Sequence, residues 1–409
     1  MSDVPLSSVP PWLTIIGIGE DGRAGLGPAA TAALDAAEVV YGGSRHLALA
    51  APKSAEGRVW PRPIADAYPG LLARRGRPTC ILATGDPFHY GIGAEIARML
   101  PAAEMCAFPH PSAFSLAAAR LGWPLAETTC LTLHGRALER IVPQLQPSAR
   151  LLVLTWDGTT PEAVAALLTE RGFGDSRLVV LEAMGGPRER RLEAQANAFT
   201  LTGIDALNTL AVEIVADADA RVVSLSPGLD DAWFENDGQL TKADIRAVTL
   251  AALRPRAGQR LWDIGAGAGS ISIEWMLRHP SLRSLAIEAN PARAARIARN
   301  AARLGVPDLR VVEGEAPAAL NGLERPDAIF IGGGVARPGV LDRAIDDLSP
   351  GGRLVANVVT LEGEAVLLGA FARLGGQLKR LSVAHADPVG QLHGWRAAMP
   401  VTQWVWTKR

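Results

Sequence analysis

The stretch Asp263-Ile264-Gly265-Ala266-Gly267-Ala268-Gly269 decides the fold of the second half of the chain. It ends the apolar run Arg260–Ile264 and opens a helix predicted over Ser270–Arg278, so its glycines lie where a buried strand turns into a helix. Glycines at such a turn let the chain reverse tightly and let a ligand lie against bare main chain. We therefore expect a ligand of the nucleotide type to bind over this loop.

The spacing of these glycines separates two kinds of ligand. A dinucleotide loop has the spacing GxGxxG and places a pyrophosphate at the helix N-terminus. This chain has GxGxG, and Asp263 precedes it. An acid beside the loop repels phosphates, whereas it suits a ligand that carries a positive sulfonium and an amino group. We predict that Asp263, Gly265, Gly267 and Gly269 bind such a cofactor, with an NAD site as the alternative.

Further cofactor candidates follow at the ends of the neighbouring strands. Glu288 ends the next predicted strand, where an acid can accept hydrogen bonds from both ribose hydroxyls. Glu315 follows the third strand and can accept from an adenine amino group. Gly332 and Gly333 end the fourth strand and leave open space at the carboxyl edge of the sheet. Thr241 is predicted to cap the first helix of this half, Lys242–Leu253, and completes the candidate set.

Strands and helices alternate regularly after residue 241, which predicts a doubly wound α/β sheet. The chain ends differently, because no helix separates the strand-like runs Gln377–Ala384 and Val401–Trp406. Two consecutive strands without a crossover helix predict an antiparallel hairpin at one edge of the sheet.

Together, residues 241–409 resemble the Rossmann-like methyltransferases that depend on S-adenosylmethionine. The resemblance implies that S-adenosylmethionine is the cofactor of this half. One position departs from the family pattern: the third acid is usually Asp, and in this chain it is the longer Glu315.

The first half carries a second series of motifs. Gly17-Ile18-Gly19 ends the predicted strand Trp12–Ile18, and the segment Ala83–Gly93 joins a strand end, an acid, a proline and a helix start. Ser112, after Pro111, is predicted to cap the helix Ala113–Leu121. The segments Thr155–Pro161 and Glu182–Pro187 follow in the same order.

This series resembles the tetrapyrrole methylase family over about residues 12–215. The family has two α/β lobes with S-adenosylmethionine bound between them, which implies a second cofactor site in this chain. Carried over motif by motif, the cofactor-binding candidates of this half are Gly17, Gly19, Gly85, Asp86, Ser112 and Glu182. The chain departs from the common first motif, Gly-x-Gly-Pro-Gly, because Glu20-Asp21-Gly22 follows Gly19. That variant, together with Leu133-His134-Gly135-Arg136, resembles the branch that acts late in corrin-ring synthesis.

The two halves define the predicted domains, residues 1–220 and residues 221–409. The acidic, aperiodic segment Asp217–Gly238 is predicted to link them. The fusion as a whole resembles the bifunctional, decarboxylating methyltransferases of cobalamin biosynthesis. That family implies methylation at carbon 5 of the macrocycle by the first half, and methylation at carbon 15 with loss of the ring C acetate carboxylate by the second.

A tetrapyrrole substrate of this family carries many carboxylates, and arginine binds carboxylates through two parallel hydrogen bonds. We name Lys242, Arg246, Arg337 and Arg396 as substrate-binding candidates, each of which could equally be a solvated surface residue. The sequence identifies no catalytic residue, because methyl transfer to an electron-rich carbon needs in-line approach and exclusion of water rather than an activated nucleophile.

Composition and charge bear on the competing functions. Residues 1–220 carry 18 Lys and Arg against 23 Asp and Glu, and the remaining residues carry 23 against 19. An acidic first half argues against an RNA methyltransferase, although the tetrapyrrole methylase fold also serves that function. A non-enzymatic scaffold that binds S-adenosylmethionine and an NAD-dependent oxidoreductase also compete with the methyltransferase interpretation.

The remaining expectations concern the setting of the enzyme. The three cysteines show no metal-binding or redox spacing, so we expect free thiols, no bound metal and a cytoplasmic location. Met1–Pro11 lacks the pattern of a signal peptide, and no apolar run is long enough to cross a membrane. Both resembled families imply a homo-oligomer. The resemblance to the corrin-synthesis branch implies a small-molecule partner, and the net charge of −1 argues against nucleic acid.

Overall fold

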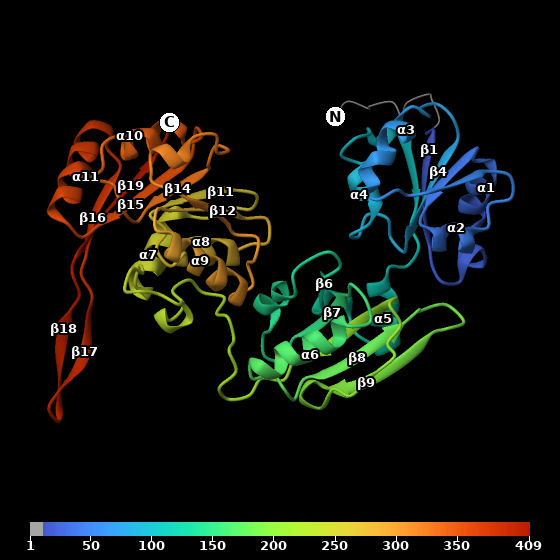
Figure 1. The fold of residues 1–409 in the computed structure, drawn as a ribbon, viewed down its shortest axis with the longest axis horizontal. Helices are drawn as coiled ribbons and strands as arrows, with labels where there is room; N and C mark the ends of the chain where they lie inside the picture. Colours follow the sequence, from blue (N-terminus) through green and yellow to red (C-terminus); the bar gives the residue numbers. More distant parts are fainter. Residues whose placement is uncertain (1–10) are drawn as a thin grey trace. The chain divides into compact units, whose positions relative to one another are not determined.

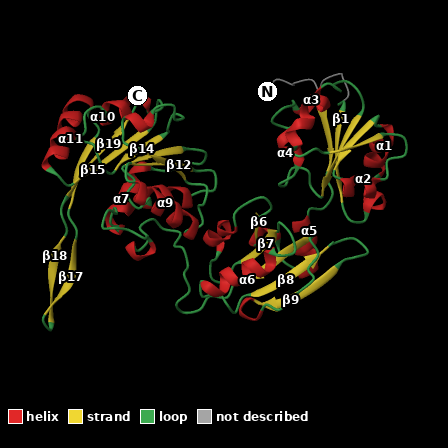
Figure 2. Ribbon diagram, viewed as in Figure 1, coloured by secondary structure: helices red, strands yellow, loops and turns green. Residues whose placement is uncertain are grey.

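The computed structural model describes residues 11–409, so most of the stretch Met1–Pro11 considered for a signal peptide lies outside the described residues. The chain forms two compact units (Figures 1 and 2). The first contains the chain up to Leu138 together with Gln146–Arg221, and the second contains Val222–Arg409 together with the short segment Glu139–Leu145.

The first unit begins with a parallel five-stranded sheet in the order β3-β2-β4-β1-β5. Its strands are β1 (Leu13–Ile18), β2 (Val39–Gly42), β3 (Glu56–Val59), β4 (Thr79–Thr84) and β5 (Met105–Phe108). The central strands are apolar on both faces because helices cover both sides, as in doubly wound sheets. The helices are α1 (Pro28–Ala36), α2 (Ser44–Ala50), α3 (Tyr68–Leu72) and α4 (Ile92–Ile96).

A second sheet of the first unit has the order β6-β7-β10-β8-β9 and is mainly antiparallel. Its strands are β6 (Thr129–Thr132), β7 (Arg150–Leu154), β8 (Arg177–Glu182), β9 (Arg190–Gln195) and β10 (Asn208–Glu213). Two helices accompany it, α5 (Ala113–Leu121) and α6 (Thr160–Glu170). Two α/β lobes in the first half were predicted, and this architecture confirms them.

The second unit is built on one seven-stranded sheet in the order β13-β12-β11-β14-β15-β19-β16. Five strands are parallel: β11 (Arg260–Ile264), β12 (Arg283–Glu288), β13 (Arg310–Glu313), β14 (Ala328–Ile331) and β15 (Arg353–Val358). The last two, β16 (Gln377–Leu381) and β19 (Val401–Thr407), add an antiparallel edge. The doubly wound sheet with an antiparallel edge is therefore confirmed.

Helices cover both faces of this sheet, as Figure 1 shows. On one face lie α7 (Ala243–Leu253), α8 (Ser270–Leu277) and α9 (Pro291–Arg303), and on the other α10 (Val340–Asp347) and α11 (Leu361–Leu374). Alternate strand residues such as Trp262, Ile264 and Trp404 form the core under α10 and α11. Because β11 to β15 are parallel, their carboxyl ends all lie at one edge of the sheet, which is where ligands bind in this type of fold.

Two segments of the second unit differ from the sequence prediction. The connection between β16 and β19 forms a further hairpin, β17 (Ala384–Val389) and β18 (Leu392–Ala397), which projects from the sheet in Figure 1. The segment interpreted as a linker instead packs into the second unit from residue 222 onward, with Val223, Leu229 and Phe234 buried. Its lack of periodicity reflects an irregular packed segment, because side-chain contacts rather than backbone repeats hold it in place.

Candidate active sites

A cavity of about 1750 Å³ opens at the carboxyl edge of the sheet in the second unit. Its wall contains the glycine loop after β11, the end of β12, the loops after β13 and β14, and the end of β15. The structure brings eight predicted residues to this wall: Thr241, Lys242, Gly265, Gly267, Glu288, Glu315, Gly332 and Gly333. Arg337 is the ninth. Separate strand ends therefore converge on one site.

Bare backbone forms the floor of this cavity. Gly265 has a φ of 73°, and a Cβ added to it would lie 2.8 Å from the Gly333 nitrogen. Gly267 has a φ of 60°, and its Cβ would lie 2.7 Å from the carbonyl oxygen of Gln239. Both positions require glycine, because a side chain would collide with backbone that cannot move away. The cradle fits a flat, polar ligand that lies directly on the main chain.

Glu288 is the best-placed acid of the site. It ends β12, is 6% exposed and lines the cavity. One carboxylate oxygen accepts from the Gly267 nitrogen at 2.8 Å and the other from the Asn290 nitrogen at 2.9 Å. Each oxygen keeps a free lone pair, so the fixed carboxylate can still accept two hydroxyl groups side by side. This is the geometry that a ribose diol requires.

Two candidates assigned to different ligands contact each other. The guanidinium of Arg337 forms an ion pair with the carboxylate of Glu315, and both side chains are largely exposed. Lys242 likewise lies 3.3 Å from Asp231. These exposed pairs are weak enough to exchange partners when a charged ligand enters.

Asp263 was predicted to bind the cofactor, but its side chain lies away from the cavity. It is 1% exposed, and its Oδ2 accepts from the backbone nitrogen of Ser272 at 3.1 Å and from the Ser272 hydroxyl at 2.8 Å. Its Oδ1 is buried without a hydrogen-bond partner. The side chain turns away from the cavity because the odd residues of β11 point toward α8. Gly269 is also absent from the cavity wall: it begins α8 with a φ of 77°, and a Cβ there would lie 2.7 Å from Ile297.

The position of Asp263 predicts a pH-dependent stability. Burial raises its pKa to about 7, although hydrogen bonds from Ser272 oppose the shift. Below about pH 4 the group is protonated in both folded and unfolded chains, so it costs nothing. Between about pH 4 and 7 only the unfolded chain ionises freely, so the free energy of unfolding falls as pH rises.

We therefore expect Asp263→Asn to stabilise the second unit by roughly 1–4 kcal/mol near pH 8 and by little near pH 4. Hydrogen exchange in peptides that cover Ser270–Leu277, compared between the two proteins at each pH, measures the difference in the second unit. Parallel pH profiles for the wild type and the variant would rule out ionisation of Asp263 as the cause.

Two substrate-binding candidates lie elsewhere. Arg246 is fully buried in α7, and its guanidinium contacts Glu274 at 2.5 Å, Asp231 at 3.2 Å and the carbonyl oxygens of Thr241 and Leu229. Four of its five N–H donors are occupied and the side chain is not part of the cavity wall, so the prediction that it binds substrate is wrong. Arg396 lies on the projecting strand β18, 81% exposed and paired with Asp387, and it is not part of the cavity wall.

Thr241 lines the cavity but does not cap α7. The N-cap is Lys242, and no side chain caps the helix. The carbonyl oxygen of Thr241 accepts from Arg246 instead. The sequence pattern predicts a cap at Thr241, but the buried Arg246 fixes this backbone instead by donating to the Thr241 carbonyl oxygen.

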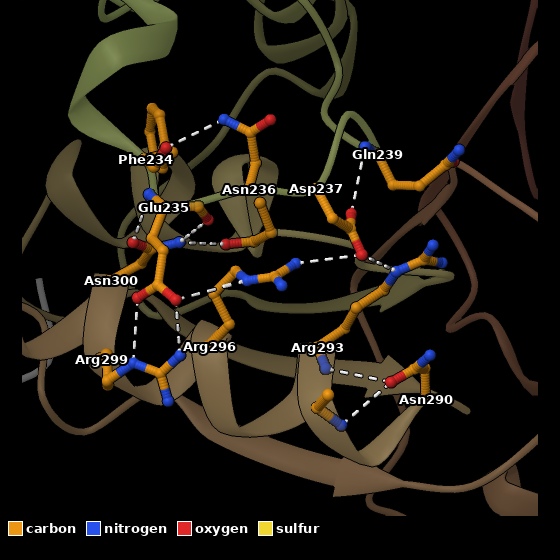
Figure 3. A network of polar contacts seen from close by, with 12 residues as sticks. Phe234, Glu235, Asn236, Asp237, Gln239, Asn290, Arg293, Arg296, Arg299 and Asn300 are labelled. Atoms are coloured by element: carbon orange, nitrogen blue, oxygen red, sulfur yellow. Dashed lines mark hydrogen bonds and ion pairs between the residues drawn. The ribbon is translucent and has the colours of Figure 1, made fainter.

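A strap over the cavity, which we define as residues 228–241, was not predicted from the sequence. Figure 3 shows how α9 holds it: Glu235 pairs with Arg299 at 2.6 Å, and Asp237 pairs with Arg293 at 2.9 Å and Arg296 at 3.2 Å. Asn300 binds both the nitrogen and the oxygen of Glu235, each at 2.9 Å. The strap therefore closes over the glycine loop, where Gln239 approaches Gly267.

Opening of the strap should govern exchange of the cofactor. Asp237→Asn removes one charge from the pairs with Arg293 and Arg296, and each such pair contributes about 0.2–1 kcal/mol. We expect release of the cofactor that the resemblance implies, S-adenosylmethionine, to become roughly two- to thirtyfold faster. Chase of labelled ligand with excess unlabelled ligand measures the rate. Asp342→Asn, which breaks the exposed pair with Arg373, is the matched control and should leave the rate unchanged.

In the first unit, three loops meet at the ends of β1, β4 and β5. A Cβ on Gly17 would lie 1.9 Å from the Gly85 oxygen and 2.5 Å from the His110 nitrogen, and one on Gly85 would lie 3.0 Å from the Cα of Ser112. A Cβ on Gly19 would lie 2.5 Å from the Cε1 atom of the His110 ring. The glycines predicted from separate motifs thus form one closely packed cluster at the carboxyl edge of the first sheet.

The polar candidates of the first unit have mixed placements. Ser112 is confirmed as the N-cap of α5, since its hydroxyl accepts from the Ser115 nitrogen at 3.2 Å. Asp86 accepts from the Phe88 nitrogen at 2.8 Å and remains partly exposed. Glu182 is 2% exposed, and Arg190 and the Asp205 nitrogen already occupy its carboxylate. The Arg190 hydrogen bonds lower the pKa of Glu182, so this side chain stabilises the second lobe rather than offering a free ligand.

Comparison with known proteins covers both units. Residues 12–199 match the family model for tetrapyrrole (corrin/porphyrin) methylases, and residues 232–408 match the model for a precorrin methyltransferase domain. A precorrin-6Y C(5,15)-methyltransferase (decarboxylating) from Sinorhizobium sp is 54% identical to the chain and covers 100% of both proteins. One of the same name from Mycobacterium tuberculosis is 42% identical and covers 97% of this chain and 100% of its own.

The chain belongs to the precorrin-6Y C(5,15)-methyltransferase (decarboxylating) family.

Members of this family are methyltransferases that use S-adenosylmethionine, so the resemblance stated from the sequence motifs is confirmed. A shorter relative, the cobalt-precorrin-6B C(15)-methyltransferase (decarboxylating) of Salmonella typhimurium, is 35% identical over 166 residues, which are 40% of this chain and 85% of its own. Within residues 11–409, no helix is long and apolar enough to span a membrane, and no group of three or more His, Cys, Asp or Glu is arranged to hold a metal ion.

Proposed function

We propose that the chain methylates precorrin-6Y at carbons 5 and 15 with S-adenosylmethionine and removes the carboxylate of the ring C acetate as carbon dioxide, as a step of cobalamin biosynthesis. The observation that carries the proposal is the full-length match to relatives of this name, combined with a cavity whose glycine cradle and Glu288 fit the cofactor. Bound S-adenosylmethionine supplies an electrophilic methyl group on a sulfonium.

We assign one cofactor site to each unit. The glycine cluster around Gly17 and Gly85 supports a site in the first unit, and the cavity around Gly265 and Glu288 supports one in the second. Methylation at carbon 5 then belongs to the first unit, and methylation at carbon 15 with decarboxylation to the second. A relative named for carbon 15 and decarboxylation alone matches 166 residues, a length that suits a single unit.

The residues of the second unit have distinct tasks in this proposal. Glu288 fixes the ribose, and the closely packed backbone of Gly265 and Gly333 forms the floor under the methionine part of the cofactor. Lys242 and Arg337, at the rim of the cavity, attract the substrate carboxylates. The strap excludes water, so that the acceptor carbon and the methyl group meet at about 3–3.5 Å. Loss of carbon dioxide leaves its bonding electron pair in the conjugated macrocycle, which acts as the electron sink.

Mass spectrometry of precorrin-6Y incubated with the chain and S-adenosylmethionine tests the proposal. A product with two added methyl groups and one carbon dioxide lost is expected. Asp86→Ala should leave the product without the carbon 5 methyl group, and Glu288→Gln should leave it without the carbon 15 methyl group and with its carboxylate. An unchanged substrate in the presence of bound S-adenosylmethionine would contradict the assignment.

The proposal includes a homo-oligomer in the cytoplasm. The β17–β18 hairpin exposes Val389, Leu392 and Trp395, each at least 65% exposed, and a lone two-stranded hairpin is barely stable in water. A second copy that covers this surface would stabilise it. We expect light scattering to give a mass above one chain, and Trp395→Glu to lower that mass. The three unpaired cysteines suit a reducing compartment.

A further inference from the structure

A buried polar cluster beneath the cavity of the second unit has no role in the site described so far. It joins three side chains: Thr249 on α7, Asn357 at the end of β15 and Gln403 on β19. Thr249 and Gln403 are both 0% exposed, whereas Asn357 is partly exposed and lines the cavity. They lie between α7 and the sheet, on the same face as the buried pair Arg246–Glu274, but no hydrogen bond joins the cluster to that pair among the contacts of the described residues.

The hydrogen bonds of the cluster fix the carboxamide of Asn357. The Thr249 hydroxyl donates to the Ile245 carbonyl at 2.7 Å, so its oxygen must accept, and it does so from Asn357 Nδ2 at 2.8 Å. Gln403 Nε2 donates to Asn357 Oδ1 at 3.0 Å. One hydrogen of Asn357 Nδ2 remains without a partner among these contacts.

The cluster is costly to bury. Gln403 Oε1 has no hydrogen-bond partner, and an unsatisfied buried carbonyl costs about 1–3 kcal/mol. Valine or leucine at positions 249 and 403 would fill the same layer without that cost. Thr249 and Gln403 are polar at this cost and both bond the amide of Asn357, which indicates that the orientation of this amide matters.

The sheet order places Asn357 on the acceptor side of the cavity. The glycine loop follows β11, Glu288 ends β12 on one side of it, and Asn357 lies at the end of β15, beyond β14, on the other. Neighbouring strands lie about 4.8 Å apart, so Asn357 is about 10 Å from the loop and about 14 Å from the strand of Glu288. A cofactor held by Glu288 at its ribose leaves this side for the substrate.

We propose that Asn357 binds a carboxylate of the tetrapyrrole substrate through its free Nδ2 hydrogen, and that Thr249 and Gln403 hold the amide in the orientation this bond requires. The inference rests on the proposed function of the second unit. Substrate carboxylates are its natural partners, because an amide hydrogen bonds most strongly to a charged acceptor.

The test compares Asn357→Ala, Asn357→Asp and Gln403→Leu with the wild type in the full chain, using precorrin-6Y and S-adenosylmethionine. Mass spectrometry follows the carbon 15 methylation and decarboxylation separately from the carbon 5 methylation, and calorimetry follows cofactor binding. Asn321→Ala is the matched control, because Asn321 bonds Arg343 outside the cavity wall.

We expect Asn357→Ala to lower kcat/KM for the second-unit product roughly 10- to 100-fold, the effect of losing one hydrogen bond to a charged group, while cofactor binding and the carbon 5 methylation stay normal. Asn357→Asp should lose more, because its charge repels a carboxylate, and Gln403→Leu should raise KM with a smaller change in kcat. Normal kcat/KM in Asn357→Ala, or full activity in Asn357→Asp, would overturn the proposal. No product from the wild type would overturn the proposed function and this inference with it.

Discussion

Replacing Arg246 by methionine is expected to destabilise the second unit by about 3–5 kcal/mol, the usual cost of removing one partner of a buried ion pair. Arg246 and Glu274 are both 0% exposed, and the methionine leaves the carboxylate of Glu274 buried without a cation. Glu274 still accepts from the nitrogens of Gly228 and Leu229, which begin the strap. Loss of the pair therefore loosens α7, α8 and the strap together.

Hydrogen exchange in peptides that cover Ser270–Leu277 measures this effect in the second unit alone, which a global melting curve of a two-unit chain does not. The double variant Arg246→Met with Glu274→Gln removes the unpaired charge and should recover part of the protection. Arg373→Met is the matched control, because Arg373 is exposed and pairs only with the exposed Asp342 among the ion pairs of the described residues. Normal exchange in Arg246→Met would contradict the predicted loosening of α7, α8 and the strap.

The sequence contained the signal that places Arg246 in the core. Arg246, Thr249, Leu250 and Leu253 follow the helical spacing i, i+3, i+4 and i+7, so position 246 belongs to the stripe that faces the sheet. The charge of the residue favoured a surface or ligand role, whereas its position favoured burial. Among the basic candidates, position relative to the helix stripe was the better guide.

Strand ends and glycine loops were predictable because they depend on local rules. β11 has the predicted bounds, and the glycine loop follows it as expected, since a buried apolar run with a tight turn has few other solutions. The side chains around the loop were less predictable. Asp263 turns toward Ser272, nine residues later, through a contact that only the packing of α8 on β11 creates.

The strap could not be read from periodicity, because residues 228–241 have no regular backbone pattern. Its partners did leave a trace: Arg293, Arg296 and Arg299 are spaced by three along α9 and form one basic face. A basic helix face next to an acidic aperiodic segment predicts that the two pair. Figure 3 shows these pairs, which hold part of the segment predicted as a linker in place as a wall of the site.

Glu288→Gln is expected to weaken binding of S-adenosylmethionine to the second unit about 100-fold or more. One oxygen that accepts from the ribose diol becomes an NH2 donor and the other loses its charge, and a hydrogen bond to a charged group contributes about 1.5–3 kcal/mol. The change also disturbs the empty loop. Both carboxylate oxygens accept from backbone nitrogens, of Gly267 and Asn290, and the amide group of glutamine must face one of them with a donor. The variant therefore weakens the hydrogen bonds that hold the glycine loop as well as the binding of the ribose.

Calorimetry with S-adenosylmethionine measures the result and tests the assignment of one site per unit. The wild type should bind two equivalents, and Glu288→Gln should bind one with unchanged affinity, because the glycine cluster around Gly17 lies in the other unit. Glu324→Gln, an exposed glutamate paired with Arg260, is the matched control and should bind two. Loss of both binding events in Glu288→Gln would mean that the chain has a single cofactor site. Retention of both binding events would mean that the ribose is held elsewhere in the cavity. Glu288 is the acid chosen for the test because, among the contacts of the described residues, it is the wall acid that two backbone nitrogens of adjoining loops anchor.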